Sequence, residues 1–207
     1  MVNAEEIFKG FCRHYNSFNI IYDETLSTHT SRLVSYFDTL GRMLGYRIFS
    51  EYSMGKLIPA CSQDLEGKKV DIVWGYFNNG GKIRLELAAE LQQSFNLSEY
   101  EKDIKKLATL SAKLKVFYCA AKDSEEIVDM VVEELGQHSG KEKNQFLIIV
   151  DPWVSPSKFG EGKFRGILLD HTGKLGVGTA NVMKINDDTQ KLRLLLNVQW
   201  KNLASDT

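Results

Sequence analysis

The sequence predicts an α/β protein built around a mixed central sheet with helices on both sides. Three apolar stretches with the alternation of strands follow one another in the first half of the chain, and helix–strand repeats come after them. Strands joined by short turns pair antiparallel, whereas a strand–helix–strand unit brings the chain back parallel to itself. A sheet that contains both arrangements is covered by helices. From residue 154 on, turn signals between short apolar runs predict a β-rich C-terminal elaboration.

The composition is that of a globular protein without an overall preference for polyanions. Hydrophobic residues are 43% and charged residues 26% of the 207 residues, close to the usual values. The net charge of −1 excludes a global electrostatic footprint for nucleic acid and leaves only local patches. The three cysteines form no CxxC pair or Cys/His cluster that would suggest zinc. With no signal-peptide pattern and no apolar run of about 18 residues, we expect a cytoplasmic protein without a membrane span.

Periodicity and capping signals place the individual elements. Helices are expected at 3–16, 29–44, 97–113 and 123–135, and strands at 46–52, 69–77, 82–92, 114–121 and 145–153. Ser98 and Glu101 match a capping box, and the Asn-Asn-Gly-Gly run at 78–81 predicts a hairpin turn. We expect residues 1–153 to form the α/β core with its N-terminal helices. Residues 154–207 should form an extension packed on the same domain.

Two glutamates raise the question of function, because they share one face of a predicted strand. Side chains alternate across a strand, so Glu86 and Glu90 point the same way. The expected hairpin places Asp71 of the preceding strand opposite Ala88, within about 7–8 Å of either glutamate. Carboxylates repel one another and lose free energy on burial. Such a row of acids therefore needs either water or a cation.

A divalent cation and a solvated surface are the two interpretations of this row. Two carboxylates at this spacing can share Mg²⁺, which fills the rest of its coordination shell with water and phosphate oxygens. In the alternative, the acids lie on an ordinary exposed strand face, and Arg84 neutralises Glu86 in a surface ion pair of little energetic weight. Alternation by itself fits both interpretations, because any half-exposed strand shows it.

The order of the elements and these residues together resemble the PD-(D/E)xK nuclease superfamily, which includes restriction endonucleases and Holliday-junction resolvases. The resemblance covers about residues 29–121, which would form the restriction-endonuclease-like αβββαβ core. In that family an acid at the start of the second strand and an acid-x-lysine on the third hold Mg²⁺ and activate water. Asp71 in KKVDIVWG matches the first acid. Glu90-Leu91-Gln92 matches the second part, with glutamine in place of lysine.

The resemblance implies a set of site residues. Asp71, Glu90 and Gln92 would be catalytic, and Asp71 and Glu90 would hold Mg²⁺ or Mn²⁺ with Glu86 as an extra ligand. Gln92 would orient the attacking water but cannot act as its base. The other possible match, Glu86-Leu87-Ala88, puts alanine at the lysine position, where it can do no polar work. Residues expected to contact nucleic acid are Lys68, Lys69, Lys102 and Lys106, and one of the last two would replace the missing lysine in space.

The activity implied by the resemblance is Mg²⁺-dependent hydrolysis of phosphodiester bonds in DNA, by an endonuclease or exonuclease. A homodimer would let such an enzyme cut both strands of a duplex. The alternative is a catalytically inactive nuclease-like fold that acts as a nucleic-acid-binding or protein-assembly module. Gln92 and the near-neutral charge favour this alternative. The three acids favour the enzyme, because a site that has lost its catalytic activity has no reason to retain them on one face.

Overall fold

The computed structural model describes residues 2–18, 26–50, 70–92, 96–121, 124–137, 145–152, 162–187 and 190–203. Within these ranges the helices are α1 (Ala4–Phe18), α2 (Leu26–Met43), α5 (Leu97–Ala108) and α6 (Glu125–Gln137). The strands are β1 (Arg47–Ser50), β2 (Ile72–Phe77), β3 (Ile83–Gln92), β4 (Leu114–Ala120), β5 (Gln145–Asp151), β6 (Lys163–Asp170), β7 (Gly173–Asp187) and β8 (Gln190–Asn202). No helix in the described part of the chain is both long and apolar enough to cross a bilayer.

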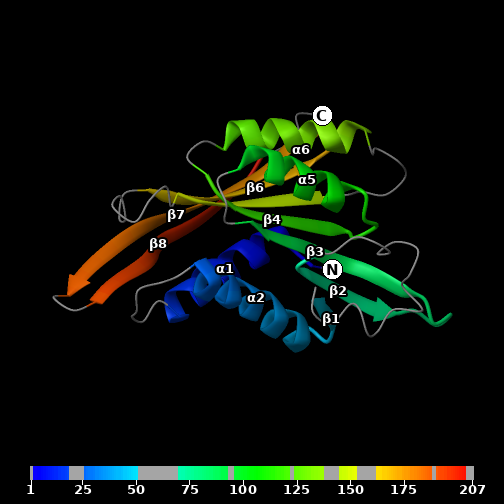
Figure 1. Ribbon diagram of the computed structural model, residues 1–207, viewed down its shortest axis with the longest axis horizontal. Helices are drawn as coiled ribbons and strands as arrows, with labels where there is room; N and C mark the ends of the chain where they lie inside the picture. The colour runs from blue at the N-terminus through cyan, green and yellow to red at the C-terminus, as the bar shows by residue number, and fades with distance from the viewer. Residues whose placement is uncertain are drawn as a thin grey trace.

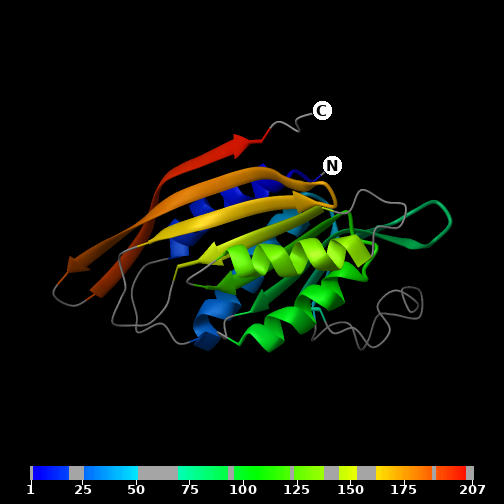
Figure 2. The ribbon, with the colours of Figure 1, turned by 90° about the horizontal axis from the view of Figure 1, so that it is seen from above.

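All eight strands of the described residues form one sheet, in which they lie in sequence order from β1 to β8. The first three pair antiparallel, β3–β4 and β4–β5 pair parallel, and β5 to β8 pair antiparallel again. Helices α1 and α2 cover one face, and α5 and α6 cover the other (Figure 1). The predicted α/β class with a mixed sheet is therefore confirmed, as are antiparallel strands in the C-terminal part. The long β7–β8 hairpin extends away from the helices (Figure 2).

Two apolar cores lie on the two faces of the sheet. The core beneath α5 and α6 includes Ile104 and Phe117, and the core beneath α1 and α2 includes Phe11, Trp74 and Tyr118. All seven residues of β4 are buried, because this strand lies between two parallel neighbours and is covered on both faces. The continuous apolar run of β4 in the sequence is explained by this double burial.

The N-cap and the last residue of α5 differ from the prediction. Asn96, two residues before the expected capping serine, is the N-cap, and its side-chain oxygen accepts a hydrogen bond from the Ser98 N–H at 3.1 Å. Asparagine and serine are similarly good N-caps, so the earlier residue caps the helix, which begins at Leu97 as predicted. The helix ends at Ala108 instead of 113, where the Thr109 hydroxyl donates to the Lys106 carbonyl at 2.8 Å. Helix α2 begins at Leu26, earlier than the predicted 29.

A β-bulge interrupts β3 and breaks the alternation that the sequence suggested. Trp74 of β2 pairs with Leu87, but the next residue, Gly75, pairs with Leu85, so Glu86 is an extra residue on β3. A bulge of this kind shifts the side chains on one side of it relative to the other. Leu85 consequently lies in the α5/α6 core and Leu87 in the α1/α2 core, whereas strict alternation placed both on one face.

The bulge also changes which residue lies opposite Asp71. The predicted register put Asp71 opposite Ala88, midway between the two glutamates. In the structure Ile72 pairs with Ala89, so the preceding residue, Asp71, lies beside Glu90. The predicted register was therefore wrong by two residues at this end of the hairpin, because it allowed neither for the bulge nor for a turn of residues 78–82.

Candidate active site

The carboxylates of Asp71 and Glu90 lie together at the end of the β2–β3 pair. Val73 and Ala88 belong to the core beneath α5 and α6, and Asp71 and Glu90 are each two residues further along their strands, so they point to the same face. Oδ2 of Asp71 accepts a hydrogen bond from the Leu91 N–H at 2.7 Å, which ties the aspartate to the backbone of β3. Glu90 is 4% exposed. The β-ladder thus holds two acids side by side in a largely buried position.

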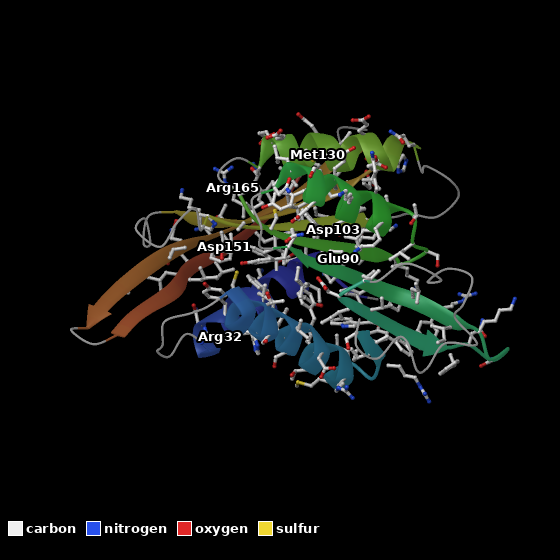
Figure 3. All side chains as sticks on the ribbon, in the orientation of Figure 1. Arg32, Glu90, Asp103, Met130, Asp151 and Arg165 are labelled. Carbon is white, nitrogen blue, oxygen red and sulfur yellow. The ribbon has the colours of Figure 1, made fainter. Side chains whose placement is uncertain are left out.

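Helix α5 adds two more charged side chains to this pair. Nζ of Lys106 lies 2.6 Å from Oε1 of Glu90 and 3.0 Å from Oδ1 of Asp103. Residues three apart share a helix face, so Asp103 and Lys106 can both reach β3 while the apolar residues of α5 pack on the sheet. Nε2 of Gln92 donates to Oδ2 of Asp103 at 3.2 Å. Figure 3 shows Glu90 and Asp103 near each other where α5 meets β3.

We call these five residues the carboxylate cluster: Asp71, Glu90, Gln92, Asp103 and Lys106. Burial, together with the neighbouring Asp71, raises the pKa of Glu90 from 4.5 to about 9, and Lys106 only partly opposes this. Burial also raises the pKa of Asp71, although the Leu91 N–H, the Glu90 side chain and Lys106 favour its ionised form. At neutral pH the carboxyl of Glu90 therefore keeps its proton.

The lysine of the cluster remains charged. Burial lowers the pKa of Lys106, but the hydrogen bonds and charges of Glu90 and Asp103 outweigh this effect and raise its pKa overall. The cluster thus holds three carboxyl groups and one ammonium, and the proton on Glu90 offsets one of the two excess acids. A bound divalent cation would offset both without the proton.

The donor set fits a hard divalent cation held by two carboxylates. Oε1 of Glu90 is fully buried, and its partner among the described residues is the ammonium of Lys106 at 2.6 Å. Mg²⁺ commonly takes one or two carboxylates and keeps water or phosphate oxygens in its other positions. In the described part of the chain, no three His, Cys, Asp or Glu side chains gather closely enough to form a full protein ligand set. Asp71 and Glu90 would therefore hold the ion with solvent and substrate oxygens completing its shell.

The other residues predicted from the sequence lie elsewhere. Glu86 is 3% exposed and forms an ion pair with Lys113 just before β4, so the structure does not bring it to the carboxylate cluster. Lys102 is exposed on α5 and forms no ion pair with the described residues of the cluster. Lys68 and Lys69 fall outside the described residues. Gln92 and Lys106 do lie in the cluster.

Asp103 is the member of the cluster that the sequence interpretation missed. The signal that points to it is the Asp103-x-x-Lys106 spacing beside the apolar residues of α5, since this spacing directs both side chains toward the sheet. Asp103 contacts both Gln92 and Lys106, so it fixes the position of the two polar partners of the carboxylate pair.

A second buried acid has a structural partner. Asp151 at the end of β5 is fully buried, and its Oδ2 accepts a hydrogen bond from the Tyr118 hydroxyl at 2.7 Å. Tyr118 belongs to the core beneath α1 and α2, on the face of the sheet opposite to the carboxylate cluster. Asp151 is therefore separate from the candidate site.

Comparison with known proteins found no similar protein. No family model, no curated protein and no solved structure matches the chain. The function must accordingly be argued from the carboxylate cluster and the fold that carries it.

Proposed function

We propose that the chain is a Mg²⁺-dependent nuclease that hydrolyses phosphodiester bonds in DNA. The observation that carries the proposal is that Asp71 and Glu90 lie side by side at the end of the β2–β3 pair, next to the amine of Lys106. The order of elements supports it, since α2, β1, β2, β3, α5 and β4 follow one another as in the restriction-endonuclease-like core. So does the sheet, in which an antiparallel meander is followed by a parallel strand.

Each residue of the carboxylate cluster has a role in this proposal. Asp71 and Glu90 hold the ion, and Mg²⁺ bound there supplies Lewis-acid polarisation of the phosphate and a more acidic bound water. The ammonium of Lys106 stabilises the negative charge that develops on the phosphate oxygens in the transition state. Lys106 thereby takes the role of the lysine that is missing from β3. Gln92 is fixed by Asp103 and can orient a water without exchanging a proton with it.

One observation favours the second candidate function, an inactive nuclease-like module that binds nucleic acid or another protein. The ammonium of Lys106 already lies against Glu90 within the chain, with Nζ 2.6 Å from Oε1. In a retired site an internal cation of this kind would make the metal dispensable. The two candidates therefore differ in whether a divalent ion binds at Asp71 and Glu90 at all.

Calorimetric titration with Mn²⁺ and Mg²⁺ separates the candidates. The wild type should bind one ion, and Asp71→Asn and Glu90→Gln should each lose it. The matched control is Glu86→Gln, because Glu86 is also a buried glutamate of β3 with a lysine partner but lies outside the cluster. We expect this variant to bind as the wild type does.

Cleavage of duplex, single-stranded and branched DNA by the same proteins completes the test. The proposal expects cleavage by the wild type and Glu86→Gln and none by the two site variants. Absence of ion binding by the wild type, even with a DNA oligonucleotide present, would contradict the nuclease and support the inactive module.

A further inference from the structure

The hairpin that joins β2 to β3 projects beyond the helices on both faces of the sheet (Figure 2). Its turn is held by Asn78, whose Oδ1 accepts hydrogen bonds from the N–H groups of Gly80 and Lys82 at 3.0 Å each. Gly81 takes a positive φ of 73°, a conformation that glycine adopts without strain. The projecting hairpin is therefore an ordered surface, and Lys82 at its end is exposed.

This end of the sheet is positively charged. Residues 72–85 contain Lys82 and Arg84 but no acid, and residues 39–50, which include β1, contain Arg42 and Arg47 but no acid. Arg42 is paired with Asp38. In the ranges that the structure covers, Arg47, Lys82 and Arg84 take part in no ion pair. We call the β2–β3 hairpin together with Arg47 the basic ribbon.

An aromatic ring prepares one of these cations for binding. The guanidinium of Arg47 lies over the ring of Phe77, 4.7 Å from its centroid, and Phe77 is 43% exposed. Stacking of this kind restrains the guanidinium and leaves its N–H donors directed along the plane of the group. A phosphate can accept two of these hydrogen bonds at once.

The cations lie on both faces of the basic ribbon. Arg47 pairs with Gly75, and Arg84 pairs with Tyr76, the next residue of β2. Adjacent residues of a strand point to opposite faces, so Arg47 and Arg84 do too. The groove of a duplex encloses a two-stranded ribbon with a phosphate strand on either side, whereas a membrane or a flat protein surface meets one face only. Charges on both faces thus favour a duplex groove.

We propose that the basic ribbon binds the phosphate backbone of a nucleic-acid duplex at a distance from the carboxylate cluster. Arg84 and Glu90 are six residues apart on β3, which corresponds to about 20 Å along the strand. Successive base pairs are about 3.4 Å apart, so the ribbon contacts the duplex about six base pairs from the reacting phosphate. The inference rests on the proposed function for the choice of a nucleic acid as the polyanion.

Fluorescence anisotropy with a labelled duplex of about 20 base pairs tests the ribbon, over a series of salt concentrations in EDTA so that no cleavage is needed. The test protein combines Arg47→Gln, Lys82→Gln and Arg84→Gln. The matched control combines Lys163→Gln, Lys174→Gln and Lys201→Gln, which removes the same charge from exposed positions of β6, β7 and β8. A second test protein, Lys82→Glu alone, changes only the exposed turn and keeps the fold intact.

The basic-ribbon variant should bind at least about tenfold more weakly than the wild type, and the slope of log K against log salt should become shallower by about two to three. The control should bind nearly as the wild type does, and Lys82→Glu should be intermediate. Equal effects in the two triple variants, or no effect in either, would overturn the inference. Binding of the wild type to phosphatidylserine vesicles but not to the duplex would overturn it as well.

Cleavage measured separately in Mg²⁺ keeps the two proposals distinguishable. If the protein binds DNA through the basic ribbon but never cuts it, this inference stands and the nuclease proposal is refuted. If the protein cuts DNA equally well with and without the cations of the basic ribbon, the nuclease proposal stands and this inference is refuted.

Discussion

Replacing Glu90 with glutamine should stabilise the folded protein while removing its proposed metal ligand. Burial and the neighbouring Asp71 raise the pKa of Glu90 to about 9, whereas its ordinary value is 4.5. Between these values the folded state holds a proton that the unfolded state releases, so the stability of the wild type falls as the pH rises through this window. Glutamine has the shape of the protonated acid and cannot ionise, so the variant escapes the penalty.

The size of the effect at neutral pH follows from the two pKa values. About 2.5 pH units separate pH 7 from the ordinary pKa of a glutamate, and each is worth about 1.4 kcal/mol, so the penalty is about 3 kcal/mol. For a chain of this length that corresponds to a rise in Tm of about 6–12 °C. The contact with Lys106 survives in part, because the amide oxygen of glutamine can still accept its hydrogen bond.

Thermal and urea unfolding in EDTA at about pH 5, 7 and 8.5 measures this stabilisation. The gain for Glu90→Gln should be small at the lowest pH and largest at the highest. The control is Glu101→Gln on α5, an exposed glutamate whose pKa is lowered by hydrogen bonding to Lys105, so this substitution should not stabilise the fold. A Glu90→Gln protein less stable than the wild type throughout, or a gain that does not grow with pH, would refute the reasoning.

Three further predictions concern the metal, the lysine and the packing. Mn²⁺ affinity should increase as the pH rises toward 9, because the ion displaces the proton that Glu90 holds. If Mn²⁺ binding gives the same heat in two buffers of different ionisation enthalpy, no proton is released and this prediction is wrong. Lys106→Met should slow cleavage by about 10²-fold without weakening Mn²⁺ binding, while Lys102→Met changes neither and Lys106→Arg restores part of the rate; loss of ion binding in Lys106→Met would instead make the lysine structural. Gly178→Ala should destabilise the fold by about 1–3 kcal/mol, because the new methyl group would lie 2.5 Å from the Phe8 ring. Gly136→Ala meets open space near the end of α6 and should stabilise it by up to about 1 kcal/mol; similar unfolding midpoints for the two glycine variants would contradict this explanation.

Much of the fold can be predicted from local patterns. The run Leu114–Ala120 is apolar at nearly every position, and a strand buried on both faces in a parallel arrangement has this character. The hairpin signal at residues 78–81 and the turn signals after residue 154 mark antiparallel connections that the structure contains. These features are local, because turn chemistry and hydrophobic period depend on neighbours in the sequence.

The bulge at Glu86 could not be predicted in this way. An alternation of period two assigns every residue of a strand to one of two faces, and a single extra residue reassigns all those beyond it. The bulge and the turn of residues 78–82 together made the predicted register wrong by two residues, and this error made Glu86 an equal partner of Glu90. In the structure the ion pair with Lys113 separates Glu86 from the carboxylate cluster.

The sequence by itself determined the class of the fold, the order of its elements along the chain and the presence of Asp71 and Glu90 on one predicted hairpin. Only the tertiary structure decided that these two acids lie side by side and that Asp103 and Lys106 of α5 join them. Strand periodicity describes contacts within a hairpin. The approach of a helix to a sheet depends on the packing of Tyr100, Ile104 and Leu107 in the core, which no local pattern records.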